Sequence, residues 1–127
     1  MRAIVSRDLA DASLAGLSSD RQFATAYNAV LQLSKMVIAC AGYRIIGPDH
    51  HKTTFAALKL AMGSEAATLA RYFDTCRRKR NIIDYDLASA ASETEAAELK
   101  AKANEFKGMV EDWIAAHHPR FAPVADP

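Results

Sequence analysis

The sequence of 127 residues is 50% hydrophobic and 24% charged, and it contains only 5 Gly and 4 Pro. This composition excludes disordered, collagen-like and low-complexity architecture, and the length suits one domain. The formal net charge of +1 at pH 7 does not favour nucleic-acid binding over the whole surface. We therefore expect a single globular domain over residues 1–127.

The apolar residues recur at intervals of three and four along the whole chain, which predicts an all-α fold. The expected architecture is an up-and-down bundle of four main helices with a short leading helix. The leading helix is expected at about 6–17, the main helices at about 19–42, 49–62, 65–81 and 92–117, and a frayed tail at 120–127.

Serine residues stand at three of the expected helix starts. Ser6 is a candidate N-cap of the leading helix. Ser19 with Gln22, and Ser92 with Glu95, fit capping boxes that open the first and the last main helix.

No expected helix resembles a membrane span. The longest strongly apolar stretch, residues 36–41, is far shorter than the roughly 20 residues that such a span needs. The first eight residues lack the apolar stretch of a secretory signal, so we expect a cytoplasmic protein without a membrane partner.

The third main helix carries a cation where its apolar stripe should continue. Leu69, Phe73 and Cys76 follow the helical spacing, and Arg80 takes the next position on the same face. A guanidinium on that face needs acceptors, which could be Asp84, carbonyl groups of the protein or a bound phosphate. Arg80 is therefore a candidate phosphate-binding residue.

The neighbours of Arg80 have both structural and functional interpretations. Arg77 could bind phosphate, or it could only interact with the carbonyl groups at the helix end. Asn81 could be a site residue or the C-terminal cap of the helix, and Tyr85 could be a site residue or a packed ring.

His50 and His51 open the second main helix, where the helix dipole favours the neutral imidazole that can accept a proton. Adjacent helical residues point about 100° apart, and no Cys or Glu spacing completes a zinc pattern, so we expect neither a metal nor a cofactor. Short connections would make successive helices antiparallel. Both histidines would then share a pole with residues 77–85 and with the end of the first main helix, opposite His117.

The charge is divided unevenly along the chain. Residues 49–80 hold seven Lys and Arg against three acidic residues, whereas residues 81–127 hold four against nine. This division could bring the basic and acidic surfaces of two copies together, or it could leave a local basic area for an anion.

The order of these helices, the His50-His51 pair and the segment 72–85 resemble the HEPN domain superfamily over about residues 19–117. The motif of that superfamily is an arginine, frequently followed by asparagine, with a histidine four to six positions further on. Arg80-Asn81 matches the first part. The positions of the histidine hold Tyr85, Asp86 and Leu87 instead.

The resemblance implies a small helical bundle, commonly a homodimer. Many HEPN domains are metal-independent endoribonucleases, often toxins or defence proteins paired with a nucleotidyltransferase-like antitoxin, and others are noncatalytic binding modules. In the family chemistry Arg80 would hold the scissile phosphate of RNA while a histidine moves protons. The ordinary pKa of tyrosine, near 10, makes Tyr85 a poor replacement, so we hypothesise that His50 or His51 supplies the base.

Three functional interpretations stay open at this point. The first is an RNA-binding or nucleotide-binding HEPN-like protein, with a toxin-like or defence-associated ribonuclease activity that uses an altered catalytic set. The second is a noncatalytic helical dimer or partner-binding module. The third, a metal or cofactor protein, is disfavoured because inward-facing Glu-x-x-His pairs are missing.

Overall fold

The computed structural model describes residues 2–14, 16–43, 51–84 and 90–122, with the backbone alone at 83–84. Within these ranges every regular element is a helix, which confirms the all-α bundle of four main helices with a short N-terminal helix. None of the described helices is long and apolar enough to cross a membrane. The elements are α1 (Arg2–Ala12), α2 (Ser19–Cys40), α3 (His51–Met62), η1 (Gly63–Ala66), α4 (Ala67–Asp84), α5 (Glu93–His117) and η2 (Pro119–Phe121).

The first helix begins and ends earlier than the expected range of 6–17. Its buried residues are Val5, Asp8, Leu9 and Ala12. Because this buried face begins before Ser6, helix α1 starts at Arg2 and Ser6 lies inside it. The prediction that Ser6 is an N-cap is therefore wrong.

The cap of α2 lies one residue before the expected one. The side chain of Ser18 accepts a hydrogen bond from the backbone N–H of Arg21 at 3.2 Å, so Ser18 is the N-cap and Ser19 is the first helical residue. The side chain of Gln22 donates to the carbonyl of Leu17 at 3.0 Å instead of completing a capping box with Ser19.

Helix α4 extends further than expected, and α5 begins as expected. Helix α4 runs to Asp84, so Asn81 lies within it and is not its C-terminal cap. The capping box of α5 is confirmed, because Ser92 and Glu95 each accept a backbone N–H from the other at 3.0 Å. A hydrogen bond from Lys79 and the capping bond from Ser92 lower the pKa of Glu95.

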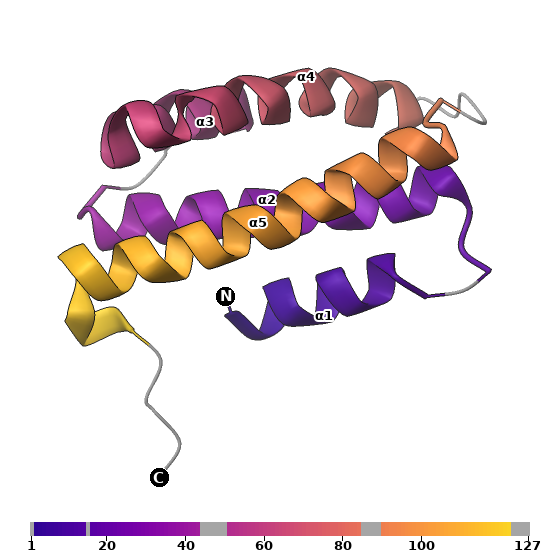
Figure 1. Ribbon diagram of the computed structural model, residues 1–127. Helices are drawn as coiled ribbons and strands as arrows, with labels where there is room; N and C mark the ends of the chain where they lie inside the picture. Colours follow the sequence, from indigo (N-terminus) through magenta and orange to yellow (C-terminus); the bar gives the residue numbers. More distant parts are fainter. Residues whose placement is uncertain (1, 15, 44–50, 85–89, 123–127) are drawn as a thin grey trace, which may run out of the picture.

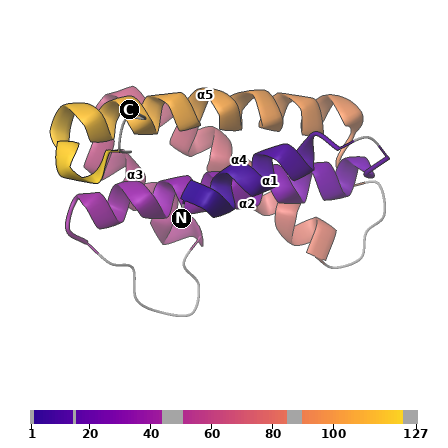
Figure 2. The same cartoon turned by 90° about the horizontal axis from the view of Figure 1, so that it is seen from below.

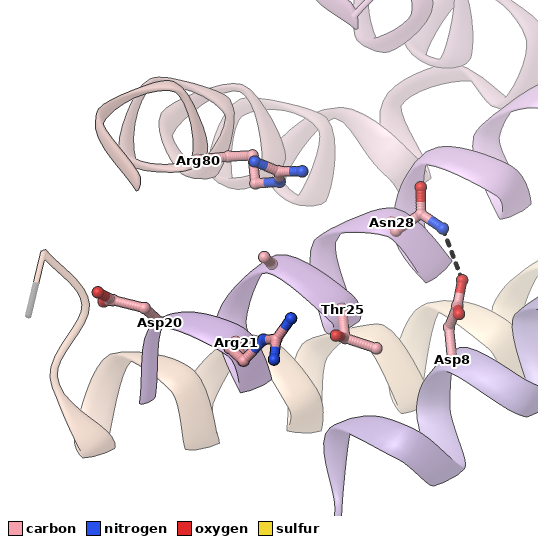
Figure 3. Close-up of a pocket in the computed structure, with 7 residues that line it drawn as sticks. Asp8, Asp20, Arg21, Thr25, Asn28 and Arg80 are labelled. Atoms are coloured by element: carbon pink, nitrogen blue, oxygen red, sulfur yellow. Dashed lines mark hydrogen bonds between the residues drawn. The ribbon is translucent and has the colours of Figure 1, made fainter. Parts of the chain in front are cut away.

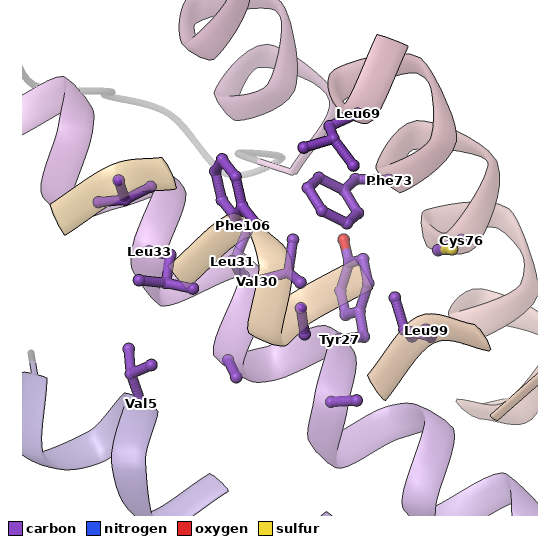
Figure 4. Packing of buried hydrophobic residues seen from close by; sticks show 14 of the residues in the cluster. Val5, Tyr27, Val30, Leu31, Leu33, Leu69, Phe73, Cys76, Leu99 and Phe106 are labelled. Atoms are coloured by element: carbon purple, nitrogen blue, oxygen red, sulfur yellow. The ribbon is translucent and has the colours of Figure 1, made fainter. Parts of the chain in front are cut away.

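A chain of aromatic rings connects α2 to α5 through the core, and Figure 4 shows Tyr27, Phe73 and Phe106 of this chain. The ring centroids of Tyr27 and Phe55 lie 6.0 Å apart, those of Phe55 and Phe73 lie 6.0 Å apart, and those of Phe73 and Phe106 lie 5.0 Å apart. All four side chains are fully buried or nearly so. Such contacts favour one relative placement of the four main helices.

Helix α2 packs against each of the other four α-helices. Helix α1 lies on one side of the layer that α2 and α5 form, and α3 and α4 lie on the other side (Figures 1 and 2). A hydrogen bond also joins the starts of α2 and α5. Asp20, near the start of α2, accepts from the backbone N–H of Ala91, just before α5, at 2.8 Å.

The directions of the helices do not alternate in the way that short connections predict. The start of α3 lies beside Tyr27, where the hydroxyl contacts His51 at 2.9 Å. Tyr27 precedes Cys40, the last residue of α2, by 13 residues, or about 20 Å of helix. Helices α2 and α3 therefore run in the same direction, and the end of α4 meets the start of α2.

The expectation that the end of α2, the first main helix, shares a pole of the bundle with the end of α4, the third main helix, is thus wrong. The physical reason is the length of the connection. The ten residues from 41 to 50 can span roughly 30 Å, so α3 need not begin beside the end of α2 and need not run antiparallel to it. The placement of His117 at the pole opposite Arg80 is confirmed, because α5 starts beside the end of α4.

Replacement of Ser92 by alanine should lower the free energy of unfolding by about 1 kcal/mol, because the N–H of Glu95 loses its acceptor. Urea denaturation measures this change. Thr94→Ala, at an exposed residue in the same helical turn, is the control and should change stability by less. Equal losses in the two variants would contradict a stabilising role of the capping box.

Candidate functional site

One face of α2 forms the floor of a pocket of about 350 Å³. Arg21, Ala24, Thr25 and Asn28 follow the helical spacing on this face, opposite the buried face of α2 that includes Tyr27. Asp8 from α1, Asp20 from α2 and Arg80 from α4 complete the lining (Figure 3). The pocket thus gathers residues from three helices that are far apart in the sequence.

Arg80 lies in this pocket as its place on the stripe of α4 predicts. Leu69, Phe73 and Cys76 are buried, and Arg80, one turn further on, is half-buried above α2 (Figure 3). Arg21 supplies a second guanidinium from the facing helix. Two guanidinium groups and the hydroxyl of Thr25 offer donors that suit a phosphate oxygen.

Carboxylates balance these cations. Asp8 is only 5% exposed, and it accepts a hydrogen bond from Nδ2 of Asn28 at 2.6 Å. Arg7 approaches Asp8 at 3.5 Å, but the Arg7 side chain is 65% exposed and contributes little. Asp20 accepts from the N–H of Ala91. The pocket therefore holds two positive and two negative side chains, and it suits a ligand that has both acceptors and donors.

His51 lies at the start of α3 and contacts the buried phenol of Tyr27, on the face of α2 opposite the pocket. Its Nδ1 atom is 2.9 Å from the Tyr27 hydroxyl, and the ring centroids are 5.7 Å apart. Burial raises the pKa of Tyr27 above its ordinary value near 10, and the charges of Arg77 and Arg80 oppose that rise. These two arginines, Tyr27 and His51 therefore share one electrostatic neighbourhood.

The contact between Tyr27 and His51 admits two hydrogen-bonding arrangements. The phenol with its raised pKa keeps its proton at neutral pH, and it can donate that proton to Nδ1 or accept from an Nδ1–H. The tautomer of His51 decides between them.

The remaining predicted site residues have different surroundings. Arg77 is half-buried, and its Nε donates to Asp74 in the same helix at 2.9 Å, away from the residues that line the pocket. Asn81 is exposed on α4. His50 and Tyr85 lie outside the described residues, as does the expected start of the second main helix at residue 49.

Sequence reasoning did not select several residues of the pocket. Arg21, Thr25 and Asn28 give a polar face at intervals of four and three, a signal that is also typical of an exposed helix surface. No sequence signal places Asp8 beside Asn28, because that contact depends on how α1 packs on α2.

The comparisons with known proteins found no relative for this chain. No protein-family model, curated protein or solved structure matches it significantly.

Replacement of Tyr27 by phenylalanine should make the protein less sensitive to alkaline pH. The folded phenol keeps its proton above pH 10 while the unfolded phenol loses it, so its contribution to stability is complete below pH 10 and declines as the pH rises. The stability difference between wild type and Tyr27→Phe should shift by about 1 kcal/mol between pH 10 and pH 11.

Urea denaturation at a series of pH values measures this difference. Tyr43→Phe, at a side chain that is 73% exposed, is the control. A constant difference between wild type and Tyr27→Phe over this range would show that the phenol titrates alike in both states.

Proposed function

We propose that this chain is a cytoplasmic, HEPN-like domain that binds RNA by holding one phosphate at Arg80. The observation that carries the proposal is the position of Arg80 on the wall of a pocket that also contains Arg21 and Thr25. A guanidinium can donate two parallel hydrogen bonds to a phosphate, and the second cation on the facing helix strengthens that attraction.

The carboxylates of the pocket limit how this RNA binding can work. Asp8 and Asp20 repel a run of phosphates, so a broad contact with the RNA backbone is unfavourable here. One nucleotide can avoid that repulsion if its phosphate contacts the two arginines and its base donates hydrogen bonds to acceptors that line the pocket. We therefore propose recognition of a single-stranded nucleotide.

We further propose that the domain is a metal-independent endoribonuclease of the toxin or defence type, paired with a nucleotidyltransferase-like antitoxin and acting as a homodimer. In this reaction the ribose 2′-oxygen attacks the adjacent phosphorus, and the bond from phosphorus to the 5′-oxygen breaks. The 2′-hydroxyl gives up its proton and the leaving oxygen takes one. His51 supports the proposal because this group, which can carry a proton, contacts the phenol of Tyr27, whose pKa is influenced by the charge of Arg80.

In this catalytic set Arg80 stabilises the charge that develops on the phosphate. His50 or His51 supplies the base, and Asn81 and Tyr85 are further members of the set. Arg77 contributes positive charge from the same helix.

A noncatalytic module that dimerises or binds a protein partner is the second candidate function. The balance of two guanidinium and two carboxylate groups in one pocket favours it, because such a surface also suits polar contacts with another protein.

Replacement of Arg80 by alanine should weaken the binding of a mixed-sequence single-stranded RNA decamer by roughly tenfold to a hundredfold, because a charged hydrogen-bonding group is lost. The slope of log affinity against log salt concentration should fall by about 0.7. Fluorescence anisotropy at several salt concentrations measures both quantities.

Arg78→Ala is the matched control, because Arg78 lies on the same helix with a side chain that is 73% exposed. It should change the affinity by much less. Equal losses in the two variants would contradict a specific contact at Arg80. Unchanged RNA affinity with an altered dimer mass in Arg80→Ala would favour the second candidate function.

RNA cleavage by the purified protein should proceed in EDTA and should fall by roughly 100- to 10,000-fold in His51→Ala, because proton transfer is impaired. Gel analysis of a labelled RNA measures the rate, and a 2′,3′-cyclic phosphate end identifies the reaction. His50→Ala should also be slow. His117→Ala, at the opposite pole, is the control.

Two results would count against this activity. If the wild-type protein cleaves RNA no faster than the Arg80→Ala variant does, ribonuclease activity is contradicted altogether. Full activity in both His50→Ala and His51→Ala would contradict the assignment of proton transfer to these histidines.

A further inference from the structure

The hydrogen bond between Asp8 and Asn28 controls which atom Asn28 presents to the pocket. A carboxylate can only accept hydrogen bonds, so the contact of 2.6 Å requires that Asn28 donates from Nδ2. The amide group of Asn28 therefore cannot turn over without placing two oxygen atoms in contact. Burial of Asp8, which is 5% exposed, makes the loss of this bond expensive.

The carbonyl oxygen of Asn28 consequently points away from Asp8. Figure 3 shows Nδ2 directed to the carboxylate of Asp8 and Oδ1 directed away from it. Asn28 and Asp8 both line the pocket that contains Arg80. The amide thus has a fixed orientation beside the proposed phosphate position.

We propose that Asn28 recognises an RNA base that carries an exocyclic amino group, with Asp8 as the positioning residue. This inference rests on the proposed binding of an RNA phosphate at Arg80. The base would donate its amino hydrogen to Oδ1 of Asn28 while the phosphate of the same nucleotide meets the two arginines of the pocket.

The chemistry of the bases makes this arrangement selective. Cytosine presents an amino donor where uracil presents a carbonyl oxygen, so uracil places an acceptor against the acceptor of Asn28. The nearby carboxylates of Asp8 and Asp20 add negative potential that favours an amino group over a carbonyl group. The pocket of about 350 Å³ lies within the range, from about 300 Å³, of sites that bind small molecules.

The test compares labelled decamers of cytidylate and uridylate, which match in length, charge and ring size. Fluorescence anisotropy with the wild-type protein should give about threefold to tenfold tighter binding of the cytidylate decamer, the effect of about one hydrogen bond. Asn28→Ala should bind the two decamers with nearly equal affinity. Asn104→Ala, at an exposed asparagine on α5, is the matched control and should keep the wild-type preference.

Asp8→Asn separates positioning from folding. An amide at residue 8 can accept from or donate to Asn28, so the orientation of Asn28 is no longer fixed and the preference for cytidylate should fall toward equality. Thermal denaturation checks that this variant is folded. A full preference for cytidylate in folded Asp8→Asn would overturn the positioning role of Asp8.

The outcomes distinguish this inference from the proposed function. Equal affinities for the two decamers in the wild type, with binding that still depends on Arg80, would overturn base recognition and leave RNA binding in place. Binding of neither decamer would overturn both proposals. An unchanged cytidylate preference in Asn28→Ala would overturn recognition by Asn28.

Discussion

The packing of Phe73 on α4 against Phe55, and of Phe55 against Tyr27 on α2, holds α4 in one register above α2. The pocket depends on that register. Phe73 and Arg80 are separated by seven residues, or about two helical turns, so they share a face of α4. Because Phe73 is linked through Phe55 to Tyr27 and α4 runs toward the start of α2, Arg80 lies above the first half of α2, where Arg21 lines the pocket. A slip of one helical turn would move the guanidinium by about 5 Å.

The charges within this pocket explain why it differs from a basic nucleic-acid surface. Asp8 is nearly inaccessible to water, and its side chain accepts a hydrogen bond from Asn28. Its carboxylate reduces the attraction that Arg80 and Arg21 exert on distant phosphates. The same carboxylate sets the orientation of the Asn28 amide. The pocket therefore combines positive and negative side chains at one place, unlike a uniformly basic surface.

The buried phenol of Tyr27 connects the core to the site. Its ring packs on Phe55, while its hydroxyl meets His51 at the start of α3. Burial raises the pKa of the phenol, so it keeps its proton at neutral pH. The HEPN-like interpretation needs a group that moves protons near Arg80, and residues 85 to 87 contain no histidine. Tertiary packing relates His51 to Arg80 through Tyr27, whose hydroxyl contacts His51 and whose pKa is influenced by the charge of Arg80.

The helical period was sufficient to predict the four main helices and the place of Arg80 on the inward stripe of α4, whereas the capping pattern predicted the Ser92-Glu95 cap but misplaced the starts of α1 and α2. These features depend on residues within one or two helical turns, so they can be read from the sequence. The direction of α3 relative to α2 and the pairing of Asp8 with Asn28 could not be read in this way. They arise from contacts between segments that are remote in the chain, and only the packing of buried side chains decides among the arrangements that the connections allow.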